Sequence, residues 1–130
     1  MVVCDTHALL FWAAQPERLP QAAADILEAE RETGNLACPD IVLWEIAMLA
    51  AKRRIVIPVS TADYIRDIVL ALRLQVLPIT PEIAKLSQSG LFQHGDPADR
   101  LIAATAMHYH APLVSGDEKL AAISGLQIIW

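Results

Sequence analysis

The stretch MVVCDTHALLFWAA, residues 1–14, decides the fold class of this chain. Met1 to Cys4 is apolar and predicts a short buried strand. Thr6 to Ala14 predicts a helix, because apolar side chains recur there at helical spacing, at Ala8, Leu9, Trp12 and Ala13. The chain therefore runs from a strand almost directly into a helix, with the acidic residue Asp5 at the junction.

The same alternation continues along the rest of the chain. Further short strands are predicted at 36–38, 76–79, 112–114 and 127–130. Helices are predicted at 20–31, 39–53, 60–72, 97–108 and 115–123, with one more beginning at Pro81 behind the capping residue Thr80. Short connections between alternating elements indicate a single α/β domain over residues 1–130. We expect a mostly parallel central sheet of four to five short strands, flanked by helices on both faces.

Composition excludes several classes of protein. Hydrophobic residues make up 55% of the 130 residues and charged residues 19%, which excludes a disordered chain. The longest candidate membrane segment, 41–51, is interrupted by Glu45 and is shorter than the ~18 apolar residues that a span needs. Because the first residues show no basic leader, we expect a cytoplasmic protein whose two cysteines, Cys4 and Cys38, are reduced. A net charge of −5 means that any nucleic-acid role needs local basic patches or bound metal.

Two expectations concern local packing. The 39–53 helix is so apolar that we expect it to be largely buried, with the basic cluster Lys52-Arg53-Arg54 at its end. Ser115 and Glu118 have the spacing of a capping box, which would place Asp117 in the first turn of the last helix.

Four acidic residues on separate segments carry the chemical signal. Asp5 follows the first strand and Asp117 follows the fourth, so both fall at the edge of the sheet where such folds bind ligands. Asp99 lies in the first turn of a helix, and Glu45 lies on an otherwise apolar helix. Converging carboxylates repel one another unless a hard cation lies between them, and Mg2+ or Mn2+ prefers oxygen ligands. Since the sequence indicates no zinc spacing, Gly-rich phosphate loop or Ser–His pair, metal-dependent hydrolysis of a phosphodiester is favoured.

Each acid also has a purely structural explanation. Asp5 and Asp96 can cap the helices that follow them, and Asp99 can complement a helix dipole. Glu45 can pair with Arg100 or with another buried cation. The joint placement of the acids favours a shared site over these separate roles.

Four segments carry a family resemblance, and they extend through nearly the whole chain. They are VCDTHALLFW (3–12), LWEIA (43–47), HGDPADRLIAATA (94–106) and LVSGD (113–117). In this order and spacing they resemble PIN-domain proteins, and more narrowly the VapC-type toxins of bacterial type II toxin-antitoxin pairs.

The resemblance implies a PIN-like fold and an endoribonuclease with a Mg2+ or Mn2+ site. Position by position, the matched acidic quartet is Asp5, Glu45, Asp99 and Asp117. Of these, the metal ligands implied are Asp5, Asp99 and Asp117. Asp96 matches the extra acid of a subgroup with a His-x-Asp-Pro-x-Asp-Arg segment, and Ser115 keeps the hydroxyl of the more common Thr. Two departures are Ala98, where that subgroup has Phe, and Gly116, which leaves the loop around Asp117 freer than usual.

The resemblance also implies partners: a homodimer, and a cognate antitoxin that covers the acidic pocket, often with an arginine. We expect RNA to be recognised in an unpaired loop, since only splayed bases enter a small acidic site. Candidate contacts to the RNA backbone are Lys52, Arg53, Arg54 and Arg100. A basic helix end explains the first three equally well, and Arg100 can instead pair with Glu45. A core or interface role explains Trp12, Trp44 and Trp130 more simply than base stacking, and His7 and His94 are most simply incidental.

Other functions compete with this one. A phosphotransferase resembling haloacid dehalogenases would use Asp5 as a nucleophile, but it requires a second acid two positions on, where this chain has His7. A receiver-type signalling domain would need paired acids after the first strand and a lysine after the fifth, and neither is visible. The main alternative is a catalytically degenerate PIN scaffold that acts as a protein or RNA binding module, which need not bind Mn2+.

Overall fold

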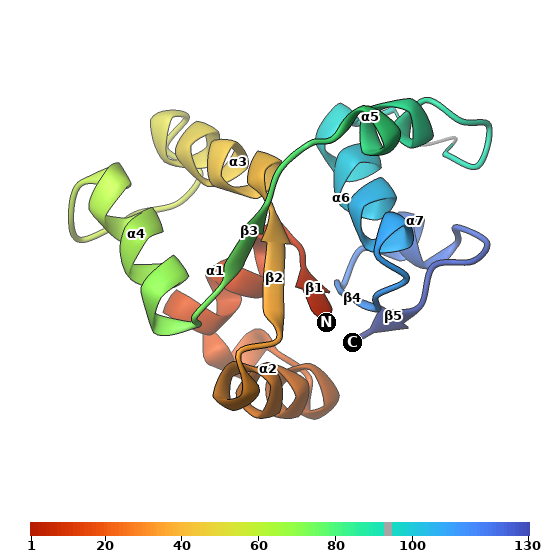
Figure 1. Cartoon of the computed structure of the whole chain (residues 1–130). Coiled ribbons are helices and arrows are strands. Elements are labelled where there is room, and N and C mark those ends of the chain that lie inside the picture. Colours follow the sequence, from red (N-terminus) through yellow and green to blue (C-terminus); the bar gives the residue numbers. More distant parts are fainter. Residues whose placement is uncertain (93–94) are drawn as a thin grey trace.

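Parallel strands form one sheet in the order β3-β2-β1-β4-β5 (Figure 1). The computed structural model describes residues 1–92 and 95–130, so His94 lies outside the described residues. The strands are β1 (Val2–Cys4), β2 (Leu36–Pro39), β3 (Gln75–Leu77), β4 (Leu113–Val114) and β5 (Ile128–Ile129). The chain first builds the sheet outward on one side of β1 and then on the other. Such a reversal leaves a crevice at the carboxyl ends of the two strands where it occurs, here β1 and β4.

Helices cover both faces of this sheet. Those described are α1 (Thr6–Ala14), α2 (Gln21–Thr33), α3 (Asp40–Ala51), α4 (Thr61–Ala71), α5 (Pro81–Ser87), α6 (Pro97–His108) and α7 (Glu118–Ala121), with a 3₁₀ turn at Pro16–Arg18. Helices α1 to α4 connect β1 to β3, and α5 to α7 connect β3 to β5. Because crossovers between parallel strands are right-handed, the two groups lie on opposite faces of the sheet (Figure 1).

The predicted fold class is confirmed. Every strand pair is parallel, and β1 lies centrally, with Val3 opposite Ala37 on one side and Leu113 on the other. The helix predicted at residues 6–14 has those bounds in the structure. The helix predicted from residue 20 ends at Thr33, where Gly34 adopts the left-handed conformation (φ 74°) that glycine tolerates best.

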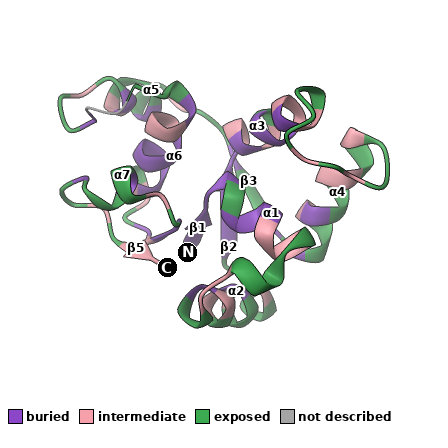
Figure 2. Cartoon of the chain, turned by 180° about the vertical axis from the view of Figure 1, so that it is seen from behind, coloured by how far each residue is buried: buried purple, intermediate pink, exposed green. Residues whose placement is uncertain are grey.

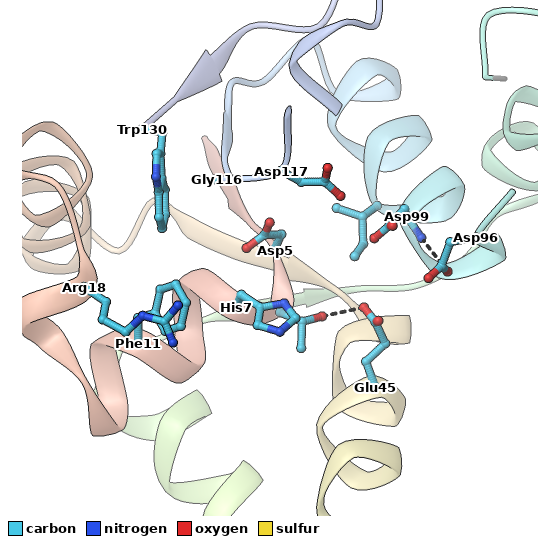
Figure 3. Close-up of a pocket in the computed structure, with 12 residues that line it drawn as sticks. Asp5, His7, Phe11, Arg18, Glu45, Asp96, Asp99, Gly116, Asp117 and Trp130 are labelled. Carbon is cyan, nitrogen blue, oxygen red and sulfur yellow. Dashed lines mark hydrogen bonds between the residues drawn. The ribbon is translucent and has the colours of Figure 1, made fainter. Parts of the chain in front are cut away.

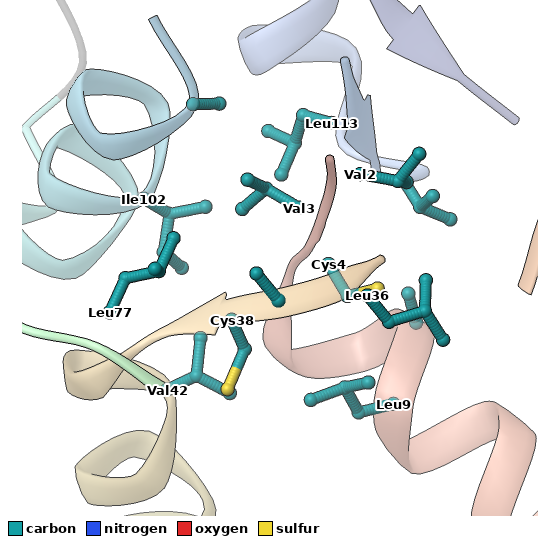
Figure 4. Close-up of a cluster of buried hydrophobic side chains, with 14 of the residues drawn as sticks. Val2, Val3, Cys4, Leu9, Leu36, Cys38, Val42, Leu77, Ile102 and Leu113 are labelled. Carbon is teal, nitrogen blue, oxygen red and sulfur yellow. The ribbon is translucent and has the colours of Figure 1, made fainter. Parts of the chain in front are cut away.

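The core lies where the sheet meets its helices. Side chains from the central strands, α1, α3 and α6 interdigitate around fully buried residues such as Val3, Leu36 and Ile102 (Figure 4). Cys4 and Cys38 are buried there as free thiols, as predicted. Burial raises the pKa of both thiols, that of Cys38 to about 12, which makes them unreactive. Among the described residues, no helix combines the length and the apolar character needed to cross a membrane.

Helix α3 is less buried than its composition predicts. Only one face packs inward, through Val42, Glu45, Ile46 and Leu49, while Trp44 keeps 58% of its surface exposed. Figure 2 shows the mixture of buried and exposed residues along this helix. The expectation of a largely buried helix was wrong, because α3 contacts the sheet and helices α1, α4 and α6 without being enclosed by them.

The segment after β4 also differs from the prediction. Helix α7 covers only residues 118–121, and its N-cap is Asp117, whose side chain accepts a hydrogen bond from the Lys119 N–H at 2.9 Å. Ser115 is not a helix cap, so the predicted capping box is wrong. The physical reason is that the Ser115 N–H still bonds the Ile129 carbonyl (3.2 Å), which keeps the chain extended beyond β4. The third strand is likewise displaced, to 75–77 instead of 76–79.

Candidate active site

A cavity of about 520 Å3 opens at the carboxyl edge of the sheet, beside the ends of β1 and β4. Five acidic residues line it, supplied by the β1–α1 junction, α3, the start of α6 and the β4–α7 loop (Figure 3). They are Asp5, Glu45, Asp96, Asp99 and Asp117. The structure thus brings together all four members of the predicted quartet and the additional predicted acid.

Asp5 combines a structural role with its place in the cavity. Its Oδ1 accepts a hydrogen bond from the Ala8 N–H at 2.8 Å, which caps α1, and its carboxylate is also hydrogen-bonded by the Ser115 hydroxyl. Burial nevertheless raises the pKa of Asp5 above its ordinary value, and the nearby Asp117 adds to the rise. Asp5 therefore both caps α1 and lines the acidic cavity.

Ser115 links the two acids that follow the central strands. Its side chain is buried, and its Oγ accepts a hydrogen bond from the Asp117 N–H at 3.1 Å while the same hydroxyl bonds Asp5. The residue does not line the cavity, but it fixes the backbone at one acid and the carboxylate of another.

Glu45 is held by Thr6, for which the sequence predicted no site role. The Thr6 hydroxyl donates to Glu45 Oε1 at 2.5 Å, and both side chains are buried. Burial raises the pKa of Glu45, and repulsion from Asp96 and Asp5 raises it further, while the Thr6 hydrogen bond opposes the rise. A polar residue in the first turn of an otherwise apolar helix was the available sequence signal for Thr6.

Asp96 and Asp99 share the first turn of α6. Asp96 is the N-cap, as its structural explanation predicted, and its Oδ1 accepts from the N–H of Ala98 at 2.8 Å and of Asp99 at 3.4 Å. Burial raises the pKa of Asp99 from 3.8 to about 7, and repulsion by the surrounding acids, with Asp96 first, contributes to the rise. Such a raised pKa is typical of a carboxyl group that is partly buried among other acids, an arrangement often found at functional sites.

The donor set fits a hard divalent cation. One carboxylate oxygen from each of Glu45, Asp96 and Asp99 lies within 4.8 Å of the other two. All donors are oxygens, as Mg2+ and Mn2+ prefer, and a cation would relieve the repulsion that raises the pKa of Asp99. The predicted ligands Asp5 and Asp117 line the same cavity outside this closest group. The assignment of individual ligands stays a prediction.

The opposite wall of the cavity is aromatic and basic. The sequence predicted a core or interface role for Trp130 and no site role for Phe11 or Arg18. Phe11, Arg18 and Trp130 line this wall, and Figure 3 shows them across the cavity from Asp96 and Asp99. The Phe11 ring lies 6.2 Å from the Trp130 ring, and the Arg18 guanidinium lies over Phe11, 4.2 Å from the ring centre. Arg18 reaches this position because the 3₁₀ turn after α1 folds back, which no local pattern indicated.

Trp130 and Gly116 make a close contact that explains the glycine. A Cβ atom at Gly116 would lie 2.5 Å from Cε2 of the Trp130 indole, closer than real contacts allow. The absence of a side chain at Gly116 therefore lets the indole lie directly against the loop that carries Asp117.

Replacing Gly116 with alanine is expected to lower the unfolding free energy by about 1–2 kcal/mol, because the new methyl group overlaps the indole. Urea unfolding of a double-mutant cycle measures this effect. In a Trp130→Ala background the overlap is gone, so the same substitution should cost little. Equal costs in the two backgrounds would contradict the contact.

The basic residues that were predicted to contact RNA lie in different places in the structure. Arg54 lines a neighbouring cavity, while Lys52 and Arg53 are exposed directly after α3, and none of these three lines the acidic cavity. Arg100 is partly buried on α6, next to Asp99. Within the described part of the chain, the basic side chains that line the acidic cavity are His7 and Arg18.

Comparisons with known proteins agree with this geometry. A family model described as the PIN domain matches residues 2–126. Ribonuclease VapC22 of Mycobacterium tuberculosis (strain ATCC 25618 / H37Rv) is 36% identical over 121 residues, which cover 92% of this chain and 88% of that protein.

Two solved structures share the fold. The crystal structure of VapBC2 from Rickettsia felis, bound to a DNA fragment from its promoter, has a TM-score of 0.69 at 23% identity and covers 98% of this chain and 97% of that one. A toxin-antitoxin complex from Klebsiella pneumoniae has a TM-score of 0.63 at 20% identity and covers 97% and 95% of the two chains. At these identities, the likeness concerns the fold alone.

Proposed function

The chain belongs to the PIN domain family, and on that premise we propose that it is a metal-dependent endoribonuclease, the toxin of a toxin-antitoxin pair. It is a homologue of Ribonuclease VapC22 over most of both chains. Residues 1–130 act in this proposal as a single PIN domain in the cytoplasm.

One observation carries the proposal. Five carboxylates from four parts of the chain line one cavity, and the oxygens of three of them lie within 4.8 Å of one another. Burial and mutual repulsion both disfavour the ionised forms of such neighbouring carboxylates, and a bound cation would offset this cost. The pKa of Asp99, raised to about 7 by burial and by the neighbouring acids, is consistent with that cost.

The acids would hold the ion, and neighbouring polar groups hold the acids. A bound Mg2+ or Mn2+ ion would be held by acids of the quartet and Asp96, and would supply the positive charge that orients and acidifies water and offsets charge on the phosphate. Thr6 holds Glu45, and the Ala8 N–H and Ser115 hold Asp5, so these carboxylates are fixed before substrate binds. Ser115 acts here as a positioning residue.

The proposed partners follow from the same cavity. A cognate antitoxin would inhibit by inserting an arginine, since a guanidinium pairs bidentately with carboxylates and competes with metal and substrate. The solved complexes of the same fold hold a toxin with its antitoxin, which supports this partner.

A homodimer is the second partner in the proposal. A mostly apolar groove of about 440 Å3 between α3 and α6, with the exposed Trp44 on its rim, supports a contact with a second copy.

Purified protein, freed of any antitoxin, is expected to cut total bacterial RNA into discrete fragments in Mg2+ or Mn2+. Chelation with EDTA should abolish cleavage, because no cation is then present to acidify water or to offset the charge that develops on the phosphate. Mapping the fragment ends identifies the target, and cuts spread evenly through duplex regions would count against recognition of unpaired loops. Folded protein that neither cuts RNA nor binds Mn2+ would support the alternative, a degenerate scaffold that acts as a binding module.

A further inference from the structure

A second cavity of about 480 Å3 adjoins the acidic one. His7, Phe11 and Arg18 line both cavities, so a ligand that leaves the acidic site past Arg18 enters the second cavity directly. The far side of this second cavity is formed by the segment after α3 and by α4, including Arg54 and Tyr64.

The two cavities have opposite chemistry. The acidic cavity has five carboxylates, whereas the described lining of the second cavity contains two arginines and no aspartate or glutamate. Its other polar and aromatic groups include Gln15, Tyr64 and the shared Phe11. In a chain with a net charge of −5, such a local reversal of charge favours an anionic ligand with an aromatic part.

The position of Arg18 favours binding of an anion. Its guanidinium stacks on Phe11 at 4.2 Å from the ring centre, and Phe11 in turn contacts the His7 ring, at 6.0 Å between centres. Stacking on the ring orients the guanidinium, and its N–H groups, which lie in the guanidinium plane, stay able to donate hydrogen bonds to a ligand. Of the ion pairs between described residues, none includes Arg18, and its one hydrogen bond there is a long one to Gln15, at 3.4 Å.

We propose that the second cavity is a substrate subsite that binds the nucleotide next to the bond cleaved in the acidic cavity. Arg18, at the junction, contacts the backbone phosphate between the two cavities, Arg54 contacts the next phosphate, and the base lies against Phe11 and Tyr64. The strand must be unpaired here, because a base held in a duplex cannot reach an aromatic wall. This inference rests on the proposed ribonuclease function.

The test measures binding of a fluorescein-labelled, random-sequence, single-stranded RNA of about twelve nucleotides by anisotropy, in EDTA and at several salt concentrations. The variant Arg18→Gln/Arg54→Gln is expected to bind about tenfold or more weakly than wild type. The slope of log affinity against log salt should fall by about 1.4, since each lost contact to a single strand contributes about 0.7. In Mn2+ the same variant should raise KM for RNA cleavage far more than it lowers kcat.

The matched control is Arg66→Gln, which removes an exposed arginine of α4 that pairs with Asp63 at 2.7 Å, outside both cavities. It should bind RNA within about twofold of wild type. A double variant that matches Arg66→Gln, or a wild type that binds no RNA, overturns the subsite. Loss of binding to a labelled glutamate decapeptide, with RNA binding unchanged, would assign the cavity to an acidic protein segment instead. Cleavage is scored separately, so a wild type that binds RNA through these arginines but does not cut it contradicts the proposed function and leaves the subsite standing.

Discussion

The substitution Asp99→Asn is expected to reduce RNA cleavage by about a thousandfold, the order of loss seen when a group that stabilises developing charge is removed. A carboxylate oxygen of Asp99 lies within 4.8 Å of oxygens of Glu45 and Asp96. Asparagine keeps the shape of the side chain but removes the charge that binds a cation. Single-turnover cleavage of a mapped RNA fragment in Mn2+ measures the effect.

A stability measurement separates this loss from unfolding. The folded-state pKa of Asp99, about 7, lies above its ordinary value of 3.8, so the folded state binds more protons than the unfolded state between these values. The metal-free protein therefore loses stability as pH rises from about 4 to 7. In EDTA, Asp99→Asn should raise the melting temperature, and should do so more at pH 8 than at pH 5. A variant that is inactive and also less stable at pH 8 would contradict this account.

Mn2+ affinity is expected to fall about fifteenfold between pH 7 and pH 5.5. Below its pKa of about 7 the Asp99 carboxyl is protonated in the metal-free protein, and a cation must displace that proton to bind. Displacing one proton costs a factor of about ten in affinity for each pH unit below the pKa, and the dependence levels off above it. Isothermal titration with Mn2+ at several pH values, with circular dichroism to confirm folding at each, measures the profile. Equal affinity at pH 5.5 and pH 7.5 would contradict it.

Asp96→Asn is the matched control for the pH profile. Repulsion from Asp96 contributes to the raised pKa of Asp99, so its removal should shift the midpoint of the profile to lower pH. Asparagine caps helices as well as aspartate does, so α6 should keep its start. A midpoint that moves upward would show that Asp96 does not repel Asp99.

The sequence predicted best where the signal was local. The helix of residues 6–14 and the strand before it were predictable, because a short apolar run, an acidic cap and helical spacing follow one another within one stretch. The start of α6 was predictable for the same reason, from Asp96 and Pro97. The start of α7 was not, because the hydrogen bond from the Ser115 N–H to the Ile129 carbonyl, which keeps the chain extended beyond β4, joins segments far apart in sequence.

The acidic half of the cavity was predictable and the aromatic half was not. Each predicted acid follows a strand or begins a helix, or is the charged exception on an apolar helix, and parallel topology brings such positions to one edge. Trp130 reaches the cavity only because β5 pairs with β4 and Gly116 leaves room for the indole. Arg18 reaches it through a 3₁₀ turn after a proline, where helical periodicity no longer applies.

Anomalous diffraction from crystals grown with Mn2+ at pH 8 shows whether the acidic cavity is a metal centre. We expect a manganese peak inside the cavity, bound by carboxylates of the group that contains Glu45, Asp96 and Asp99, and no such peak in Asp99→Asn crystals. A cavity without manganese in wild-type crystals, or a peak of equal strength in the variant, would contradict it.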